Sequence, residues 1–82
     1  MRNEDEYFAT SDFYLAAFCI AAGLALHHID RANPRRVSFV FWDSKGRKGL
    51  VEEFLLGRAT IEPKALISAI KEAKQLLHQD TV

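Results

Sequence analysis

Six basic side chains are concentrated in the middle of the sequence, where they could contact a ligand. Only Asp30 and Asp43 oppose them locally, so this region is positive although the whole chain has 11 basic and 11 acidic residues. Lysine and arginine bind phosphates, and an aromatic ring such as that of Trp42 can stack on a nucleic-acid base. One interpretation is a nucleic-acid contact; the other is a solvated hairpin whose arginines pair with the acidic N-terminus. The candidate residues are Arg31, Arg35, Arg36, Lys45, Arg47 and Lys48.

Residues that could bind a metal or catalyse a reaction do not form a recognisable motif. His27 and His28 are adjacent, and adjacent residues of a strand point to opposite faces, so we do not expect them to bind one ion. Gly46 and Gly49 in SKGRKG lack the spacing of a phosphate-binding loop. The acidic residues occupy positions typical of helix caps or solvent-facing helix surfaces. The sequence therefore predicts no catalytic residue, no cofactor and no metal site.

The run Phe13–Leu26, FYLAAFCIAAGLAL, has no charged residue in a chain that is 27% charged, so we expect it to form the centre of the fold. It is shorter than the roughly 20 apolar residues of a membrane-spanning helix, and the residues before it are acidic, whereas a signal peptide has a basic leader. Cys19 has no partner for an internal disulfide and is expected to be a buried, inert thiol, which fits a reducing compartment. We therefore expect a soluble, cytoplasmic protein.

The hydrophobic pattern predicts one small α+β domain over residues 1–82, with disorder at 1–5 and 80–82. The expected order is a helix, an antiparallel β-hairpin and two further helices, with Tyr7–Thr10 as a short edge strand. The first helix is expected over 13–22, capped by Ser11 or Asp12 and ended by Gly23. Its apolar residues point in every direction, so most of its surface should be covered.

The hairpin is predicted to pair residues 24–30 with residues 36–42 around a turn that contains Asn33 and Pro34. In the second strand Val37, Phe39 and Phe41 share one face, because successive side chains alternate. Ser38, Val40 and Trp42 share the other. Either Val40 and Trp42 form a protein interface, or helices cover both faces and bury Trp42 inside the monomer.

Two more helices are predicted in the second half of the chain. The first should begin at the capping residues Asp43 and Ser44 and end near Leu56, closed by Gly57. The second should run from Pro63 to about His78. Its predicted buried residues are Leu66, Ile67, Ile70, Ala73 and Leu77.

Several of these segments, in this order and spacing, resemble a family of small bacterial, archaeal and phage-associated proteins known only as a domain of unknown function. The resemblance covers about residues 8–77 and rests on ATSDFYLAAF, VSFVFWDS, Glu53-Phe54-x-x-Gly57 and LISAIKEAKQLL. It implies a shared fold and supplies no activity, cofactor or site residue. Members commonly have an acidic residue where this chain has Trp42, so the resemblance points to a contact surface particular to this protein.

Together these observations favour a non-catalytic interaction module that self-associates through an apolar sheet or helix face, with Val40 and Trp42 as the interface candidates. The alternative is a nucleic-acid-binding accessory protein that uses the basic residues around the hairpin. A protein partner of another kind is also compatible with the sequence, whereas no small-molecule ligand and no membrane contact is indicated.

Overall fold

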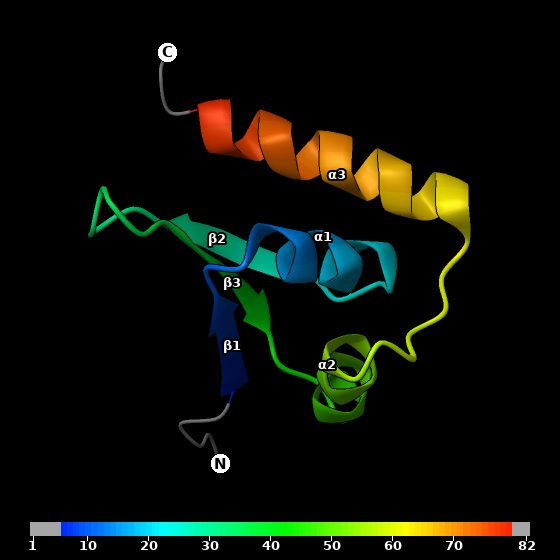
Figure 1. The fold of residues 1–82 in the computed structure, drawn as a ribbon. Helices are drawn as coiled ribbons and strands as arrows, with labels where there is room; N and C mark the ends of the chain where they lie inside the picture. Colours follow the sequence, from blue (N-terminus) through cyan, green and yellow to red (C-terminus); the bar gives the residue numbers. More distant parts are fainter. Residues whose placement is uncertain (1–5, 80–82) are drawn as a thin grey trace.

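The computed structural model of the chain describes residues 6–79, so the predicted disordered ends, 1–5 and 80–82, lie outside the described residues. Within that range a three-stranded antiparallel sheet packs against three helices (Figure 1). This is the predicted α+β arrangement, with the predicted edge strand in place. The elements are β1 (Tyr7–Thr10), α1 (Phe13–Ala21), β2 (Leu26–Asp30), β3 (Ser38–Trp42), α2 (Arg47–Leu55) and α3 (Pro63–His78).

The sheet has the order β1-β3-β2, so the hairpin strand β3 is central and both of its neighbours are antiparallel to it. On one side Tyr7 pairs with Trp42. On the other side, Leu26 pairs with Phe41 and His28 with Val40, which leaves His27 as the extra residue of a β-bulge. β2 begins later than predicted because the Leu24 N–H is bonded to the Cys19 carbonyl in the turn that ends α1. β3 begins later because the Arg36 N–H is still bonded to the Asn33 carbonyl in the loop between the strands.

The core lies on one face of the sheet, where Phe39 and Phe41 are fully buried. From α1, Leu15, Phe18 and Cys19 pack against them. Helix α2 contributes half-buried apolar side chains and has no fully buried one, whereas α3 contributes Ala73. All three helices therefore belong to the layer that covers this single face of the sheet.

Helices α1 and α3 approach each other through small side chains. In α1, Ala16 and Ala17 are completely buried. In α3, Ala73 is completely buried and Ala69 is 3% exposed. The predicted stripe of α3 was wrong at Ile67, which is 53% exposed, and it omitted Ala69. Because small alanine side chains let α1 and α3 approach closely, the buried stripe of α3 is centred on Ala69 and Ala73, which are four residues apart. Ile67 lies outside this stripe and faces solvent.

Local sequence signals set most helix ends as predicted. The Asp12 carboxylate accepts hydrogen bonds from the Tyr14 and Leu15 backbone N–H groups, both at 3.1 Å. Gly23 and Gly57 have positive φ angles of 99° and 73° and follow the C-cap residues of α1 and α2. At each of these ends the two backbone hydrogen bonds of a Schellman motif are present, for example Arg58 N–H to the Glu53 carbonyl at 2.8 Å.

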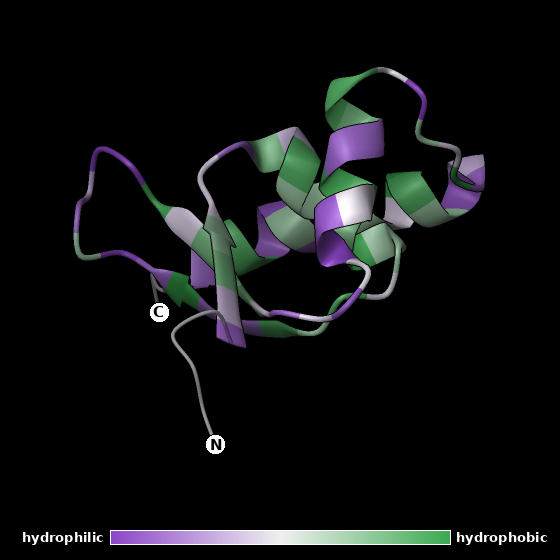
Figure 2. Ribbon diagram, turned by 90° about the horizontal axis from the view of Figure 1, so that it is seen from below, coloured by the Kyte–Doolittle hydropathy of each residue, from purple (hydrophilic) through white to green (hydrophobic). Residues whose placement is uncertain are grey.

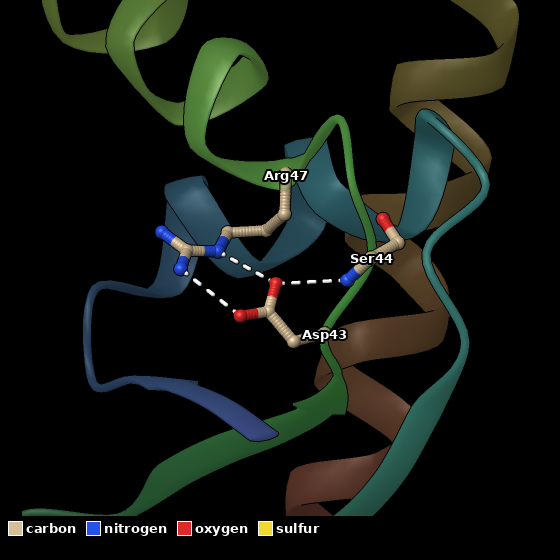
Figure 3. A network of polar contacts seen from close by, with 3 residues as sticks. All are labelled: Asp43, Ser44 and Arg47. Carbon is tan, nitrogen blue, oxygen red and sulfur yellow. Dashed lines mark hydrogen bonds and ion pairs between the residues drawn. The ribbon is translucent and has the colours of Figure 1, made fainter. Parts of the chain in front are cut away.

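The predicted caps of α2, Asp43 and Ser44, were wrong. The helix begins after Gly46, which occupies the N-cap position and makes no side-chain capping bond. The Asp43 carboxylate instead accepts hydrogen bonds from the Ser44 backbone N–H at 2.8 Å and from the Arg47 guanidinium (Figure 3). Because Arg47 occupies this carboxylate, Asp43 is not available to the first turn of the helix.

Candidate functional site

The side of the sheet opposite Phe39 and Phe41 carries the most accessible group of aromatic side chains, and we call it the open face. Trp42 and Val40 lie on it by strand alternation, as predicted, and all three strands contribute to it. Trp42 is 43% exposed and Tyr7 is 44% exposed, so burial of Trp42 inside the monomer is excluded. The open face consists of Tyr7, Ala9, His27, His28, Asp30, Ser38, Val40 and Trp42.

Three rings of the open face contact one another, one from each strand. The His27 ring lies 4.5 Å from the Trp42 ring and 5.0 Å from the Tyr7 ring, measured between centroids, and Tyr7 and Trp42 are 5.2 Å apart. These separations are typical of favourable edge-to-face and offset aromatic pairs. The rings therefore hold one another in place before any partner arrives.

Val40 shares the open face but is much less accessible than Trp42. It lies on the central strand between Ala9 and His28 and is only 8% exposed. It does not belong to the hydrophobic cluster under the helices. Trp42 and Tyr7, rather than Val40, therefore present the accessible apolar surface.

The six basic residues do not form one cluster, because they lie beyond opposite ends of β3. Arg31, Arg35 and Arg36 are in or beside the loop between β2 and β3, which is mostly hydrophilic (Figure 2). Lys45, Arg47 and Lys48 lie where α2 begins, at the other end of the strand (Figure 1). A five-residue strand separates the two groups by about 17 Å.

Two arginines near the hairpin loop make structural contacts. The Arg31 guanidinium donates hydrogen bonds to the Leu76 and Leu77 carbonyls at 2.7 and 3.2 Å, at the C-terminal end of α3. A cation there satisfies carbonyls that have no partner within the helix. Arg36 donates to the Ser11 hydroxyl at 3.1 Å and is otherwise exposed, as is Arg35. Arg35 and Arg36 are thus the most accessible basic side chains of this group.

At the other end of β3, Arg47 is bound inside the protein. Its Nε and Nη2 atoms donate to the two carboxylate oxygens of Asp43 at 2.9 and 3.1 Å (Figure 3). Its guanidinium also lies 4.4 Å from the centroid of the Phe8 ring. The hydrogen bonds from Arg47 lower the pKa of Asp43 below its ordinary value, and they outweigh the opposing effect of burial. Lys45 and Lys48 remain exposed.

The two adjacent histidines lie together, contrary to the prediction from regular strand geometry. The bulge at His27 breaks the alternation, and the Nδ1 atoms of His27 and His28 are 2.5 Å apart. Nothing in the sequence signals this bulge, since neither glycine nor proline is next to it. Across residues 6–79 there is no group of three or more histidine, cysteine or acidic side chains that could surround a metal ion.

The other features that could have formed a reactive or binding site do not do so. Cys19 is completely buried, as predicted, and burial raises the pKa of its thiol to about 11 despite the positive charge of Arg47. One hollow of the described surface is bordered by α3 and its C-cap residue alone, so it is a gap along one helix. Of the helices within residues 6–79, none combines the length and hydrophobicity needed to cross a membrane.

Residues 5–79 match the family described as Domain of unknown function (DUF5659), so the chain belongs to that family. This agrees with the resemblance inferred from the sequence. No curated protein and no solved structure matches the chain.

Proposed function

We propose that this member of the DUF5659 family is a non-catalytic module that self-associates through the open face. The observation that carries the proposal is the exposed ring cluster of Tyr7, His27 and Trp42 on a sheet face that the helices leave uncovered. Tryptophan and tyrosine are the residues most enriched among interface anchors. Because the rings already contact one another, little side-chain freedom is lost when a partner covers them.

The charge of the open face favours a second copy of the same chain as the partner. A two-fold interface brings each residue of a patch against the same patch, so a charged face would repel itself. The only charged side chain among the strand residues of the open face is that of Asp30, at the end of β2, whose carboxylate accepts a hydrogen bond from the Ala32 backbone N–H at 2.9 Å. The formal net charge of the chain is zero. Two copies can therefore meet through the ring cluster with little like-charge repulsion.

A second apolar surface competes with the open face for this role. Leu55 and Leu56, at the end of α2, are 68% and 57% exposed. They come from one helix end only, and scattered exposed leucines are common on monomers. The open face combines three strands and two large rings, so we assign the interface there.

Sedimentation of point variants tests the assignment. Trp42→Thr and Tyr7→Thr should each shift the wild-type dimer toward monomer while the far-ultraviolet circular dichroism stays unchanged. Tyr14→Thr is the matched control, because Tyr14 is 63% exposed and lies on α1, away from the open face. A dimer that survives the two open-face changes but dissociates in a Leu55→Asn variant would move the interface to α2.

The second candidate function is nucleic-acid binding, and the same exposed rings favour it. Trp42 and Tyr7 on an uncovered sheet could stack on unpaired bases, with Arg35 and Arg36 binding phosphates from the loop. A mixed oligonucleotide should then bind at low salt and dissociate as salt rises. Arg35→Glu combined with Arg36→Glu should abolish that binding without unfolding the protein, and failure of the wild type to bind would eliminate this function.

We also assign the protein to the cytoplasm as part of this proposal. The supporting observation is the free, buried thiol of Cys19, which suits a reducing compartment.

A further inference from the structure

We propose that His27 and His28 chelate one late first-row transition-metal ion through their Nδ1 atoms. The proposal rests on the bulge in β2, which places both imidazoles on the same side of the strand with their Nδ1 atoms 2.5 Å apart. Their ring centroids are 4.7 Å apart and the ring planes meet at 74°. The contact is a hydrogen bond between the two nitrogens at the protein surface, so a bound ion would take the place of the shared proton.

The geometry of the pair is close to that of a two-nitrogen chelate. Metal–imidazole bonds of about 2.0 to 2.1 Å, at bond angles between square and tetrahedral, place two nitrogens about 2.9 to 3.4 Å apart. An ion would therefore need to separate the two Nδ1 atoms by less than about 1 Å. The His28 side chain is exposed, so a small rotation of its imidazole can provide this movement while His27 stays packed.

The neighbouring rings fix one half of the chelate. His27 packs against both Tyr7 and Trp42, which limits the orientations of its imidazole. A ligand held in this way loses less freedom when the ion binds. His28 is tied to the central strand by its pairing with Val40. The ion would thus bind at the margin of the open face, although its binding to a single chain does not depend on self-association.

The ligand atoms determine which ions suit the site. Imidazole nitrogen favours copper, nickel and zinc over magnesium or calcium, and affinity for such a site follows the order Cu²⁺ above Ni²⁺ or Zn²⁺. Only two protein ligands are available among the described residues, so water would occupy the remaining positions. The site would therefore be open and of moderate affinity, unlike a closed structural zinc centre.

Titration of the tag-free full chain with CuCl₂ and NiCl₂ at neutral pH, followed by calorimetry, tests the proposal. We expect one ion per chain and tighter binding of Cu²⁺ than of Ni²⁺. His27→Ala and His28→Ala should each weaken binding at least ten-fold, because chelation needs both rings. His78→Ala is the matched control, since His78 is the only other histidine and lies at the end of α3, and it should leave binding unchanged.

Fluorescence gives a second readout that is specific for the place of binding. Trp42 is the only tryptophan, and its ring centroid lies 4.5 Å from that of His27, so bound Cu²⁺ should quench its emission. The His27→Ala and His28→Ala variants should lose this quenching. Absence of binding by the wild type would overturn the proposal. It would also be overturned if each single variant kept full affinity, or if the His78→Ala variant lost it.

Discussion

Asp43 illustrates how far a single residue can be interpreted from sequence. Its type and position suggest a helix cap, and its carboxylate is indeed used as a hydrogen-bond acceptor. The partners are the Ser44 N–H and the guanidinium of Arg47, four residues later, rather than the backbone N–H groups in the first turn of α2. A local sequence pattern predicts that a carboxylate accepts hydrogen bonds near the start of a helix. Whether the donor is a backbone N–H or a guanidinium depends on the position of Arg47, which packs against the Phe8 ring.

The Asp43–Arg47 pair should make stability depend on acid. The pKa of Asp43 is lowered in the folded state, so its contribution is present above the unfolded pKa, about 3.9, and disappears as pH falls through the lower folded value. Asp43→Asn should reduce the free energy of unfolding by about 1 to 2 kcal/mol at pH 7. Urea denaturation should show that this difference shrinks below about pH 4.

Asp12→Asn is the control for this measurement, because asparagine caps a helix about as well as aspartate does. It should cost less than about 0.5 kcal/mol at pH 7. A penalty for Asp43→Asn that stays constant from neutral to strongly acid pH would show that the charge of Asp43 is not what stabilises the fold.

Cys19 should produce the opposite dependence at alkaline pH. Its folded pKa is about 11, whereas an unfolded thiol ionises near about 8.5. Its contribution is therefore complete below about pH 8.5 and is lost as pH rises toward 11. Compared with Cys19→Ala, the wild type should lose up to about 1.4 kcal/mol of stability for each pH unit in this window. A difference in stability between the wild type and Cys19→Ala that is the same at pH 8 and at pH 10 would contradict a buried, protonated thiol.

Among the elements, those whose ends carry local signals were predictable. Asp12, Gly23, Gly57 and Pro63 act within one turn of the chain, and α1 and α3 end within a residue of the prediction. The buried stripe of α3 was not predictable in full. The close approach of α1 buries Ala69 and leaves Ile67 exposed, and this is a tertiary effect. The bulge at His27 likewise depends on the pairing of β2 with β3, which leaves no mark in the sequence.

Helix α1 should be the element on which stability depends most. Phe18 is 3% exposed, and its ring lies 5.3 Å from that of Phe54, so Phe18→Ala would leave a cavity between the two helices. We expect a loss of about 3 to 5 kcal/mol, a large part of the stability of a small domain. Thermal and urea denaturation measure this loss. Tyr14→Ala, on the exposed side of the same helix, should cost far less, and equal losses for the two variants would mean that α1 is not the central element.

At the scale of the whole molecule, the helices cover only one of the two apolar faces of the sheet. The sequence shows that both sides of β3 are apolar, and the structure places all three helices on the Phe39 and Phe41 side. The position of Trp42 on the open face follows from strand alternation alone. Tyr7 and His27 could not be added from sequence, because their contacts with Trp42 depend on the register of β1 and on the bulge in β2.

Apart from Tyr14 on α1, the exposed tyrosine and tryptophan rings of the described residues lie together on the open face. The six candidate basic residues, in contrast, are divided between the two ends of β3. This distribution favours a protein partner over a nucleic acid that would need a continuous positive track. It also means that the central claim concerns one side chain, Trp42, whose surroundings should change when two chains meet.

The emission of Trp42, measured as the wild-type protein is concentrated from nanomolar to high micromolar, tests that claim most directly. Trp42 is the only tryptophan and is 43% exposed in the single chain, so the signal comes from the proposed interface alone. We predict that its emission shifts to shorter wavelength and becomes protected from acrylamide over the same range in which sedimentation shows dimer. An emission that stays that of an exposed tryptophan while the dimer forms, or a chain that remains monomeric throughout, would contradict self-association through the open face.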